Sequence, residues 1–453
     1  MQTNIFTELI VAVTLFLFAA QPPVSAQTVK ILKLEDAIDL ALQNNHLLNI
    51  RRYQVEEKQE RVKEDRVKFL PTIAIGGSVQ YNSNLPSITV EQGRFGTLPF
   101  NGMYYPLPPI DEIIEVGEHN VYNAGVAVYQ PVSQIGKIYA GLQYSNTELQ
   151  IAQTEEARAA FQIKQGVEKL YFGLLIIRKQ IEEAIIKVAL AETKLNDIQN
   201  AVTAGKTTES NMYGLSASMA DEQQNLLKLK IQYDDYFADL IQFTGLDPTD
   251  SLELQPVQVK NYKATISAID TSLGQARSKN NDLKMALLNK TKTEYSIKAS
   301  KYSYIPDFGL LGGYTFQEGS DIYPRNNAYI GASIKWNLQD ILSNRAVQNQ
   351  RIYLKKQAEE NLMNIVEQVS RDIDKAYRKL NQSTQLIHVA EKVVEYRRAD
   401  LKIQSDRHIS GLNLESDLLS AKAAMAKAES DLYAAQYNYR IALSELKILT
   451  GDY

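Results

Sequence analysis

The chain of 453 residues contains no cysteine, which excludes disulfide bonds, thiolate metal sites and cysteine nucleophiles. It also lacks an excess of positive charge, because 49 Lys and Arg residues face 53 Asp and Glu residues. The net charge of −4 argues against a nucleic-acid-binding protein held by phosphate contacts. Tryptophan occurs once, against 26 tyrosines and 12 phenylalanines, so rings with one polar end predominate.

Sequence motifs of common enzymes are missing as well. The chain has no Gly-x-x-x-x-Gly-Lys-Ser/Thr loop for phosphates, no His-Glu-x-x-His and no Gly-x-Ser-x-Gly. The four histidines show no metal-ligand spacing: His46, His119, His388 and His408. We therefore expect no enzymatic activity, no metal and no cofactor.

Apolar runs long enough to span a bilayer as a helix are also absent. An apolar run, Leu9–Ala20, precedes Val24-Ser25-Ala26, a small-x-small cleavage site. We interpret residues 1–26 as a signal peptide, although residues 1–8 carry no Lys or Arg; a short buried helix or an anchor is the alternative. No cysteine follows the cleavage site, so a lipoprotein anchor is excluded. Elsewhere no stretch of about 18 apolar residues occurs, so we expect any membrane insertion to use β-strands.

The sequence contains an internal duplication. Tyr129-Gln130-Pro131 corresponds to Lys335-Trp336-Asn337, and Thr244-Gly245 corresponds to Thr450-Gly451, both 206 residues later. Upstream, Phe69-Leu70-Pro71 matches Tyr304-Ile305-Pro306 at an offset of 235 residues, and Asn44-Asn45 matches Asn280-Asn281 at 236. The first half therefore holds a longer excursion between Pro71 and Pro131. Such duplication favours an architecture built by symmetry over one asymmetric catalytic pocket.

Four segments alternate apolar and polar residues with the period of half-buried strands, at about 72–82, 121–130, 307–317 and 327–337. Their length of roughly ten residues suits a tilted strand that crosses a bilayer. A small sheet on a soluble core is the alternative. Residues 82–120 are rich in Pro, Gly and Tyr, and we expect an exposed loop with little regular structure there.

The rest of each half is predicted to be helical. Long helices are expected over 138–204 and 341–410, preceded by shorter ones over 34–69 and 273–304 that each end at a proline. After Gly411 a heptad seam alternates spacings of four and three and predicts helix pairing: Leu414, Leu418, Ala421, Met425, Ala428, Leu432, Ala435, Tyr439, Ala442, Leu446 and Leu449. The seam recurs 206 residues earlier, from Met212 to Phe243, with a break at Glu222.

These elements divide the chain into a first repeat over 27–245, a linker over 246–270 with two prolines, and a second repeat over 271–453. Each repeat reads helix, strand, strand, long helix, turn, heptad helix. Four strands leave two open edges, which lipid does not tolerate, and the smallest membrane barrels use eight strands. A barrel therefore requires more than one copy of the chain.

Several of these motifs together closely resemble the TolC-like outer-membrane efflux proteins: Leu34-Glu35-Asp36-Ala37-Ile38, Asn44-Asn45, Phe69-Leu70-Pro71, the tips at Gly205 and Gly411, and the two Thr-Gly ends. The resemblance covers essentially the whole mature chain. It implies a mainly α-helical protein with a β-barrel portion. Three chains would form a twelve-stranded outer-membrane barrel and a periplasmic coiled-coil tunnel. It also implies docking to a periplasmic adaptor protein and an inner-membrane pump.

The same resemblance assigns roles to residues at the two helical tips. It implies adaptor docking at Gly205, Lys206, Thr207, Gly411 and Leu412, with Asn413 on the same rim. Ordinary helix C-caps without a partner are the alternative for the two glycines, and both interpretations can hold together.

A periplasmic gate is implied by the family's carboxylates after the second tip. Asp417 matches the first, whereas the second falls at Ser420, and the position equivalent to Asp417 in the first repeat is Asn211. The family's latching tyrosine and arginine fall at His408 and Asn413, so this chain departs from that latch chemistry. A solvated helix carboxylate is the alternative for Asp417, and a plain surface residue for His408.

At the strand ends, Trp336 and Tyr81 are candidates for an aromatic girdle at the lipid interface, with packing on a helix as the alternative. The expected function is a passive outer-membrane exit duct for small molecules. The alternatives are a duct for one-step protein secretion and a non-conducting periplasmic coiled-coil scaffold.

Overall fold

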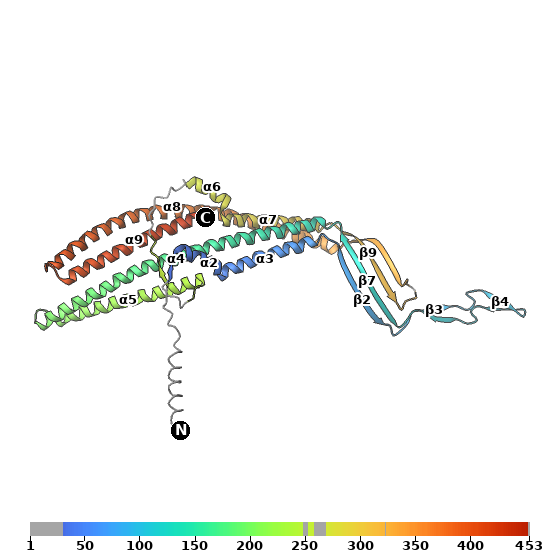
Figure 1. The fold of residues 1–453 in the computed structure, drawn as a ribbon. Coiled ribbons are helices and arrows are strands. Elements are labelled where there is room, and N and C mark those ends of the chain that lie inside the picture. Colours follow the sequence, from blue (N-terminus) through green and yellow to red (C-terminus); the bar gives the residue numbers. More distant parts are fainter. Residues whose placement is uncertain (1–29, 248–251, 258–268, 322, 452–453) are drawn as a thin grey trace, which may run out of the picture. The chain divides into compact units, whose positions relative to one another are not determined.

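The computed structural model describes residues 30–247, 252–257, 269–321 and 323–451 (Figure 1). The predicted signal peptide lies outside the described residues. The helices are α2 (Leu34–Asn44), α3 (His46–Val67), α4 (Ile135–Thr203), α5 (Glu209–Thr244), α6 (Ile269–Lys279), α7 (Asn281–Tyr302), α8 (Leu338–Ile409) and α9 (Glu415–Thr450). The strands are β1 (Lys30–Leu32), β2 (Thr72–Tyr81), β3 (Ser87–Val90), β4 (Thr97–Phe100), β5 (Met103–Pro106), β6 (Glu112–Glu115), β7 (Asn120–Pro131), β8 (Leu252–Leu254), β9 (Asp307–Glu318) and β10 (Asn326–Lys335). None of the helices in these ranges has the length and apolar character needed to cross a bilayer.

The chain forms two compact units. One contains Met1–Ile50, Ala157–Asn280 and Val369–Tyr453, and the other contains Arg51–Glu156 and Asn281–Gln368. Each unit thus takes segments from both sequence repeats, and α4 and α8 contribute to both units. The hairpin tips lie in the first unit and the four predicted strands in the second.

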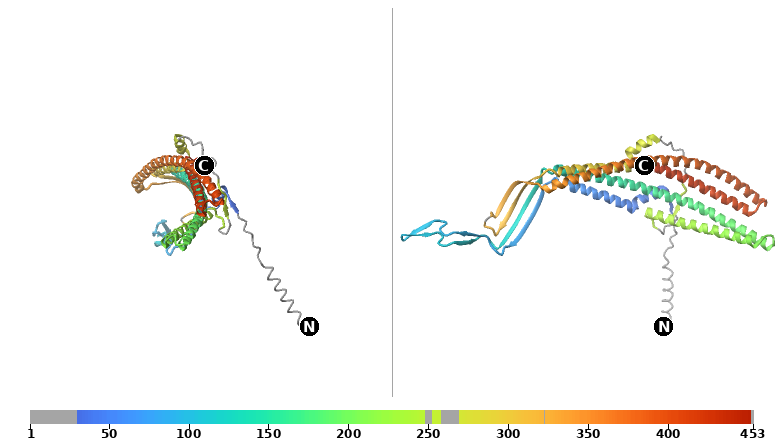
Figure 2. Two further views of the ribbon diagram at one scale, coloured as in Figure 1. Left: turned by 90° about the vertical axis from the view of Figure 1, so that its left-hand side faces the viewer. Right: turned by 180° about the vertical axis from the view of Figure 1, so that it is seen from behind.

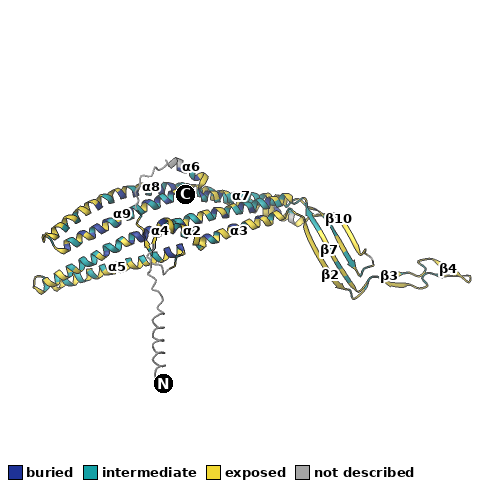
Figure 3. Ribbon diagram, in the orientation of Figure 1, coloured by how far each residue is buried: buried dark blue, intermediate teal, exposed yellow. Residues whose placement is uncertain are grey.

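The second unit holds a four-stranded antiparallel sheet in the order β10-β9-β7-β2 (Figures 1 and 2). Its register places apolar partners opposite one another, as in Ile75 with Val126, Val126 with Tyr314 and Tyr314 with Ala328. Because successive side chains alternate between faces, these residues share one face of the sheet. That face is exposed to solvent in the single chain, as for Ile75 at 82% and Ile330 at 93% (Figure 3).

The opposite face of the sheet is mostly polar or small, with Leu311 and Val121 as apolar exceptions. Ser78, Asn123 and Gln317 follow one another across β2, β7 and β9 in this face. Within the described residues the outer edges of β2 and β10 pair with no other strand. The sheet therefore combines an uncovered apolar face, an uncovered polar face and two open edges.

The prediction of an irregular loop over 82–120 is wrong. β3 pairs with β6, and β4 pairs with β5, in two antiparallel two-stranded ladders. The connection between β4 and β5 is Asn101-Gly102, and both residues have positive φ, 49° and 77°. A two-residue Asn-Gly turn of this kind matches the twist of a hairpin, so the dipeptide was the available signal.

Each of the two shorter predicted helices is in fact a pair of helices. α2 ends before Asn45, which adopts an extended conformation, and α6 ends before Asn280. The Asn45 side chain then accepts hydrogen bonds from the amides of Leu47 and Leu48 and so starts α3. Asparagine supplies this cap because its short side chain competes well with the helical backbone.

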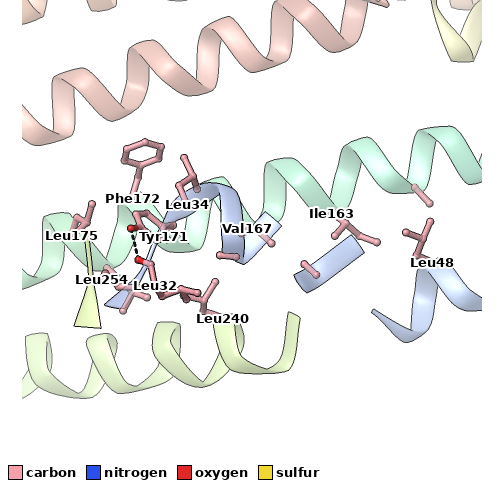
Figure 4. Packing of buried hydrophobic residues seen from close by; sticks show 14 residues of the cluster. Leu32, Leu34, Leu48, Ile163, Val167, Tyr171, Phe172, Leu175, Leu240 and Leu254 are labelled. Atoms are coloured by element: carbon pink, nitrogen blue, oxygen red, sulfur yellow. Dashed lines mark hydrogen bonds between the residues drawn. The ribbon is translucent and has the colours of Figure 1, made fainter. Parts of the chain in front are cut away.

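The core of the first unit lies where α4 meets α2, α5 and the short β1–β8 pair (Figure 4). Tyr171 is fully buried there, and its hydroxyl contacts the carbonyl oxygens of Leu32 and Gln255 at 2.9 and 2.7 Å. β8 lies within the predicted linker, and α6 begins at its last residues. The linker prediction therefore missed a strand that the tyrosine holds against α4.

The heptad seam of α9 packs as predicted along most of its length. Met425 and Ala428 are buried in a cluster with Val394 of α8. The first seam residue, Leu414, is instead the exposed N-cap of α9. The earlier seam on α5 faces α4, where Tyr236 lies against Gly173.

Candidate functional site at the helical tips

The two hairpin tips share one turn geometry. Gly205 between α4 and α5, and Gly411 between α8 and α9, both have a φ of +68°. The residue after each glycine donates its backbone amide to a carbonyl of the last helical turn. Lys206 donates to Ala201 and Leu412 donates to Arg407, each at 2.8 Å. This is the Schellman ending, which requires a left-handed residue after the helix. Glycine is needed for that conformation and not for space, because a Cβ at either position would meet nothing within 4 Å.

A polar cavity of about 390 Å³ lies beside the α8–α9 tip. Its lining comes from both helices of the hairpin: Arg397, Asp400, Gln404, Arg407, Asn413, Asp417, Ser420, Ala421 and Ala424. The structure thus brings together three of the five proposed gate residues, Asn413, Asp417 and Ser420. His408 does not line this cavity, and Asn211 belongs to the other hairpin.

Hydrogen bonds hold the cavity wall in place. Asn413 donates through Nδ2 to both the carbonyl and the side-chain oxygen of Gln404, at 3.1 and 2.9 Å. The Oδ1 atom of Asn413 is buried and has no hydrogen-bond partner among the described residues. Asn413 therefore fastens the tip loop to α8, a role that the sequence did not reveal.

Asp417 has a structural role of its own. Its Oδ2 accepts a hydrogen bond from the amide of Leu414 at 3.3 Å, and together with Glu415 it places negative charge in the first turn of α9. Both arrangements stabilise a helix N-terminus. The carboxylate is nevertheless exposed at the cavity, so helix capping and an action on passing ions are compatible.

The charges in the cavity are balanced. Arg397 and Arg407 provide two positive charges, and Asp400 and Asp417 provide two negative ones. Arg397 and Asp400 form an ion pair of 3.8 Å. Sequence reasoning missed these α8 residues, although Arg397, Asp400, Gln404 and Arg407 recur at spacings of three and four, which places them on one face of the helix.

His408 occupies a separate position in the last turn of α8. Its Nδ1 atom is buried, and no residue that the structure describes forms a hydrogen bond with it. Its backbone carbonyl accepts the Gly411 amide at 3.0 Å. The residue is thus part of the turn and not of the charged cavity.

The α4–α5 tip has no carboxylate at the position equivalent to Asp417. Asn211 donates through Nδ2 to the Thr207 hydroxyl at 2.9 Å, and Lys206 is exposed. Glu209 opens α5. The two tips therefore have the same backbone conformation and differ in their side-chain chemistry.

The two proposed girdle residues lie at opposite ends of the sheet. Tyr81 ends β2 and stacks on His119, with ring centroids 5.7 Å apart. Trp336 follows the last residue of β10, beside the end at which Asp307 pairs with Lys335. The tyrosine is 69% exposed and the tryptophan 55%, and such rings suit the two edges of an apolar band.

Comparison with known proteins gives a consistent result. The model of the family described as outer membrane efflux protein matches residues 37–246 and 272–452. No curated protein sequence matches the chain. Among the described residues, no three His, Asp or Glu side chains are grouped to hold a metal ion.

Several solved structures have the same fold. The chain is similar to the Campylobacter jejuni CmeC outer membrane channel, with 16% identity, a TM-score of 0.71 and coverage of 92% of this chain and 85% of that one. It is similar to the Vibrio cholerae outer membrane protein VceC, with 15% identity, a TM-score of 0.68 and coverage of 92% and 96%. The open state of the Neisseria gonorrhoeae MtrE outer membrane channel matches with 15% identity, a TM-score of 0.62 and coverage of 92% and 88%. The chain therefore belongs to the outer membrane efflux protein family, whose members are channels and not enzymes and lie in the outer membrane of Gram-negative bacteria with an extension into the periplasm.

Proposed function

We propose that three copies of this chain form a passive exit duct, which conducts small molecules from a periplasm-spanning pump assembly to the cell exterior. The observation that carries the proposal is the four-stranded sheet with one apolar face, one polar face and two open edges. An apolar face suits lipid and a polar face suits a water-filled lumen. In lipid the unpaired edges are too costly, so β2 of one copy pairs with β10 of the next.

A ring of three copies is compatible with the number of strands, and the copy number of three comes from the family resemblance. Each copy contributes four strands, so three copies give twelve, within the range of known membrane barrels. The contact is heterologous, since the two edges differ, and such contacts close into rings when the rotation allows it. The long hairpins α4–α5 and α8–α9 of the three copies would form the tunnel.

The gate of this duct is assigned to the cavity at the α8–α9 tip. Asp417 would present one carboxylate per copy at a narrow entrance, with Ser420 one turn further along α9. Arg397 and Arg407 share this cavity, so neutralising one carboxylate leaves an excess of positive charge there. The departures at His408 and Asn413 mean that the Asn413–Gln404 contact within one chain, and not a tyrosine–arginine latch, holds this tip.

Docking to an adaptor protein is assigned to the two tips. Gly205 with Lys206 and Thr207, and Gly411 with Leu412, form compact turns that protrude from the hairpins. Leu412 is 68% exposed, so the second tip offers an apolar contact. Energy for transport would come from an inner-membrane pump, and adaptor binding would favour the open entrance through contacts made only in that state.

Deletion of the gene, with complementation by the wild-type chain, tests the proposed function. Susceptibility to a panel of small toxic compounds should rise on deletion and return on complementation. Unchanged susceptibility together with loss of an exported protein would contradict small-molecule efflux and favour one-step protein secretion. An Asp417→Asn chain serves as a matched variant that assembles but conducts with altered ion preference.

A further inference from the structure

The last helix of the chain is buried on two sides. Its heptad seam faces α8, where Met425 packs with Val394. A second stripe repeats every seven residues: Ser416, Ala423, Ser430, Tyr437 and Ser444. Tyr437 donates its hydroxyl to the Lys169 carbonyl at 3.4 Å, and its ring lies 5.5 Å from that of Phe172. The second stripe of α9 therefore packs against α4.

The equivalent stripe on α5 has no cover in the described part of the chain. Subtracting the repeat offset of 206 gives Ser210, Ala217, Gln224, Ile231 and Ala238, all of which are exposed. Ile231 is 53% exposed, whereas its counterpart Tyr437 is packed against Phe172. Tyr213 and Leu227 add exposed apolar surface on the same side of α5, at 65% and 59%.

A groove of about 470 Å³ marks the C-terminal end of this uncovered face. It is lined by Asp234, Phe237, Ala238, Ile241, Gln242, Gly245 and Leu246. At the equivalent place on α9, the carboxylate of Glu168 from α4 approaches Ser444, Arg440 and Lys447. The groove on α5 is thus the position at which the second repeat receives a charged side chain.

The outer side of α8 is uncovered as well. Buried residues recur every seven positions on the side facing α9, at Ile373, Leu380, Ile387 and Val394. On a helix of 3.6 residues per turn, the opposite side carries exposed apolar residues at spacings of three, four and seven: Leu386, Val389, Val393, Tyr396 and Ile403. Asp374 and Arg378 lie on that side too, 206 residues after Glu168 and Phe172.

We propose that the uncovered face of α5 receives the outer side of α8 from a second copy of the chain, with Arg378 of that copy paired to Asp234. This rests on the proposed three-copy duct and names the contact that closes its helical part. A second copy is the occupant because α9 and α4 already show, within one chain, how the two surfaces fit.

The charges on the two helix surfaces identify Arg378 as the partner of Asp234. Within one chain, α4 places Glu168 beside Arg440 of α9. If α8 of one copy contacts α5 of the next in the same way, Asp374 lies beside Asp234. Two carboxylates there repel each other and need a cation. Arg378 takes the place of Phe172, so it lies against Ile231, one turn from Asp234, within reach of the longer arginine side chain. Within the described residues, Arg378 forms no ion pair.

Cross-linking in the cysteine-free chain tests this contact. Chains carrying only Ile231→Cys are co-expressed with chains carrying only Arg378→Cys, and membranes are treated with a short bis-maleimide. The expected product is a two-chain adduct that neither single variant gives alone. Replacing Ile231→Cys by Gln232→Cys, an exposed neighbour on another side of α5, should lower the yield at least about tenfold.

Charge exchange is the second arm. Arg378→Glu should lower the yield of detergent-stable three-chain particles, and so should Asp234→Arg, while the double variant should regain the wild-type yield within about twofold. A three-chain particle with no adduct and no rescue would overturn this contact and leave the duct standing. A cross-link that forms when one chain carries both Ile231→Cys and Arg378→Cys, but not in the mixture of single variants, would also overturn the contact, because it would lie within one chain. A particle without three chains would overturn the duct itself.

Discussion

The side chain of Asn44 at the end of α2 donates a hydrogen bond of 2.9 Å to the carbonyl of Thr244 at the end of α5. The second repeat makes a similar contact from Asn280 to the carbonyl of Leu449, the residue before Thr450, at 3.0 Å. The glycine after each heptad helix is crowded, because a Cβ on Gly245 would lie 2.8 Å from the Cβ of Asn44. In each repeat the Asn-Asn motif thus contacts the end of the heptad helix at its Thr-Gly motif, over 200 residues of sequence in the first repeat and 169 in the second.

Removal of these asparagine contacts should destabilise the fold. Asn280 is only 3% exposed, so Asn280→Ala should lower the free energy of unfolding by about 1–3 kcal/mol, and Asn44→Ala, whose side chain is more exposed, by about 1 kcal/mol. Gln43→Ala, next to Asn44 and exposed, is the matched control and should change little. Denaturant titration followed by circular dichroism measures the free energy of unfolding of each variant and so ranks the three losses. An equal loss for Gln43→Ala would refute the asparagine contact as the cause.

The glycines at the tips should resist substitution. Alanine at Gly205 or Gly411 would have to adopt φ near +68°, which costs about 1–2 kcal/mol. Gly214 lies within α5 and has open space around it, so Gly214→Ala should stabilise the chain by about 0.5–1 kcal/mol. Thermal unfolding of the three variants compares them directly. Stabilisation by Gly411→Ala would show that the turn does not need a left-handed residue.

Stability at high pH should depend on Tyr171. Burial raises the pKa of its hydroxyl from about 10 to about 12 in the folded chain. The neutral form is therefore favoured in the folded state, and its contribution is complete below pH 10 and lost as the pH rises toward 12. In Tyr171→Phe this contribution is absent, so the decline in stability over that interval should be shallower. Unfolding midpoints across the pH series test the difference, and parallel curves for the two proteins would count against it.

Ion preference should respond to Asp417. A unit charge about 4 Å from a passing ion contributes about 1 kcal/mol in water, so Asp417→Asn should reduce cation preference by about fivefold while the chain still assembles. Glu415→Gln removes an equal charge from the same turn but outside the cavity and should have a smaller effect. Reversal potentials in planar bilayers measure both. Identical ion selectivity in wild type and Asp417→Asn would remove this residue from the gate.

The periodicity of apolar residues was enough to predict much of the secondary structure and helix pairing from the sequence alone. The alternation around Ile75 and Tyr314 predicts strands because it has to match a two-sided sheet, and the seam through Met425 and Ala428 predicts helix pairing because one face must be buried. The break at Asn45 did not show, because the apolar pattern continues through it and the break consists only of one extended residue whose side chain caps the start of α3. Residues 82–120 depart from the prediction because Pro and Gly suggest irregular chain and outweigh the Asn101-Gly102 turn.

The candidate site was only partly accessible to the same reasoning. Gly205, Gly411 and Asp417 could be proposed from their places in the repeat. Arg397 and Arg407 could not, because their role depends on the approach of α8 to α9 and on the cavity that remains between them. The contact of Asn413 with Gln404 likewise depends on how the turn folds back, which residue types alone do not determine.

The mass of the purified mature protein, measured in detergent and in detergent-free buffer, tests the proposed duct most directly. Three open-edged sheets with apolar outer faces should give a stable three-chain particle that requires detergent. A single particle size that stays soluble without detergent would contradict the duct, since the apolar face of the sheet would then never meet lipid.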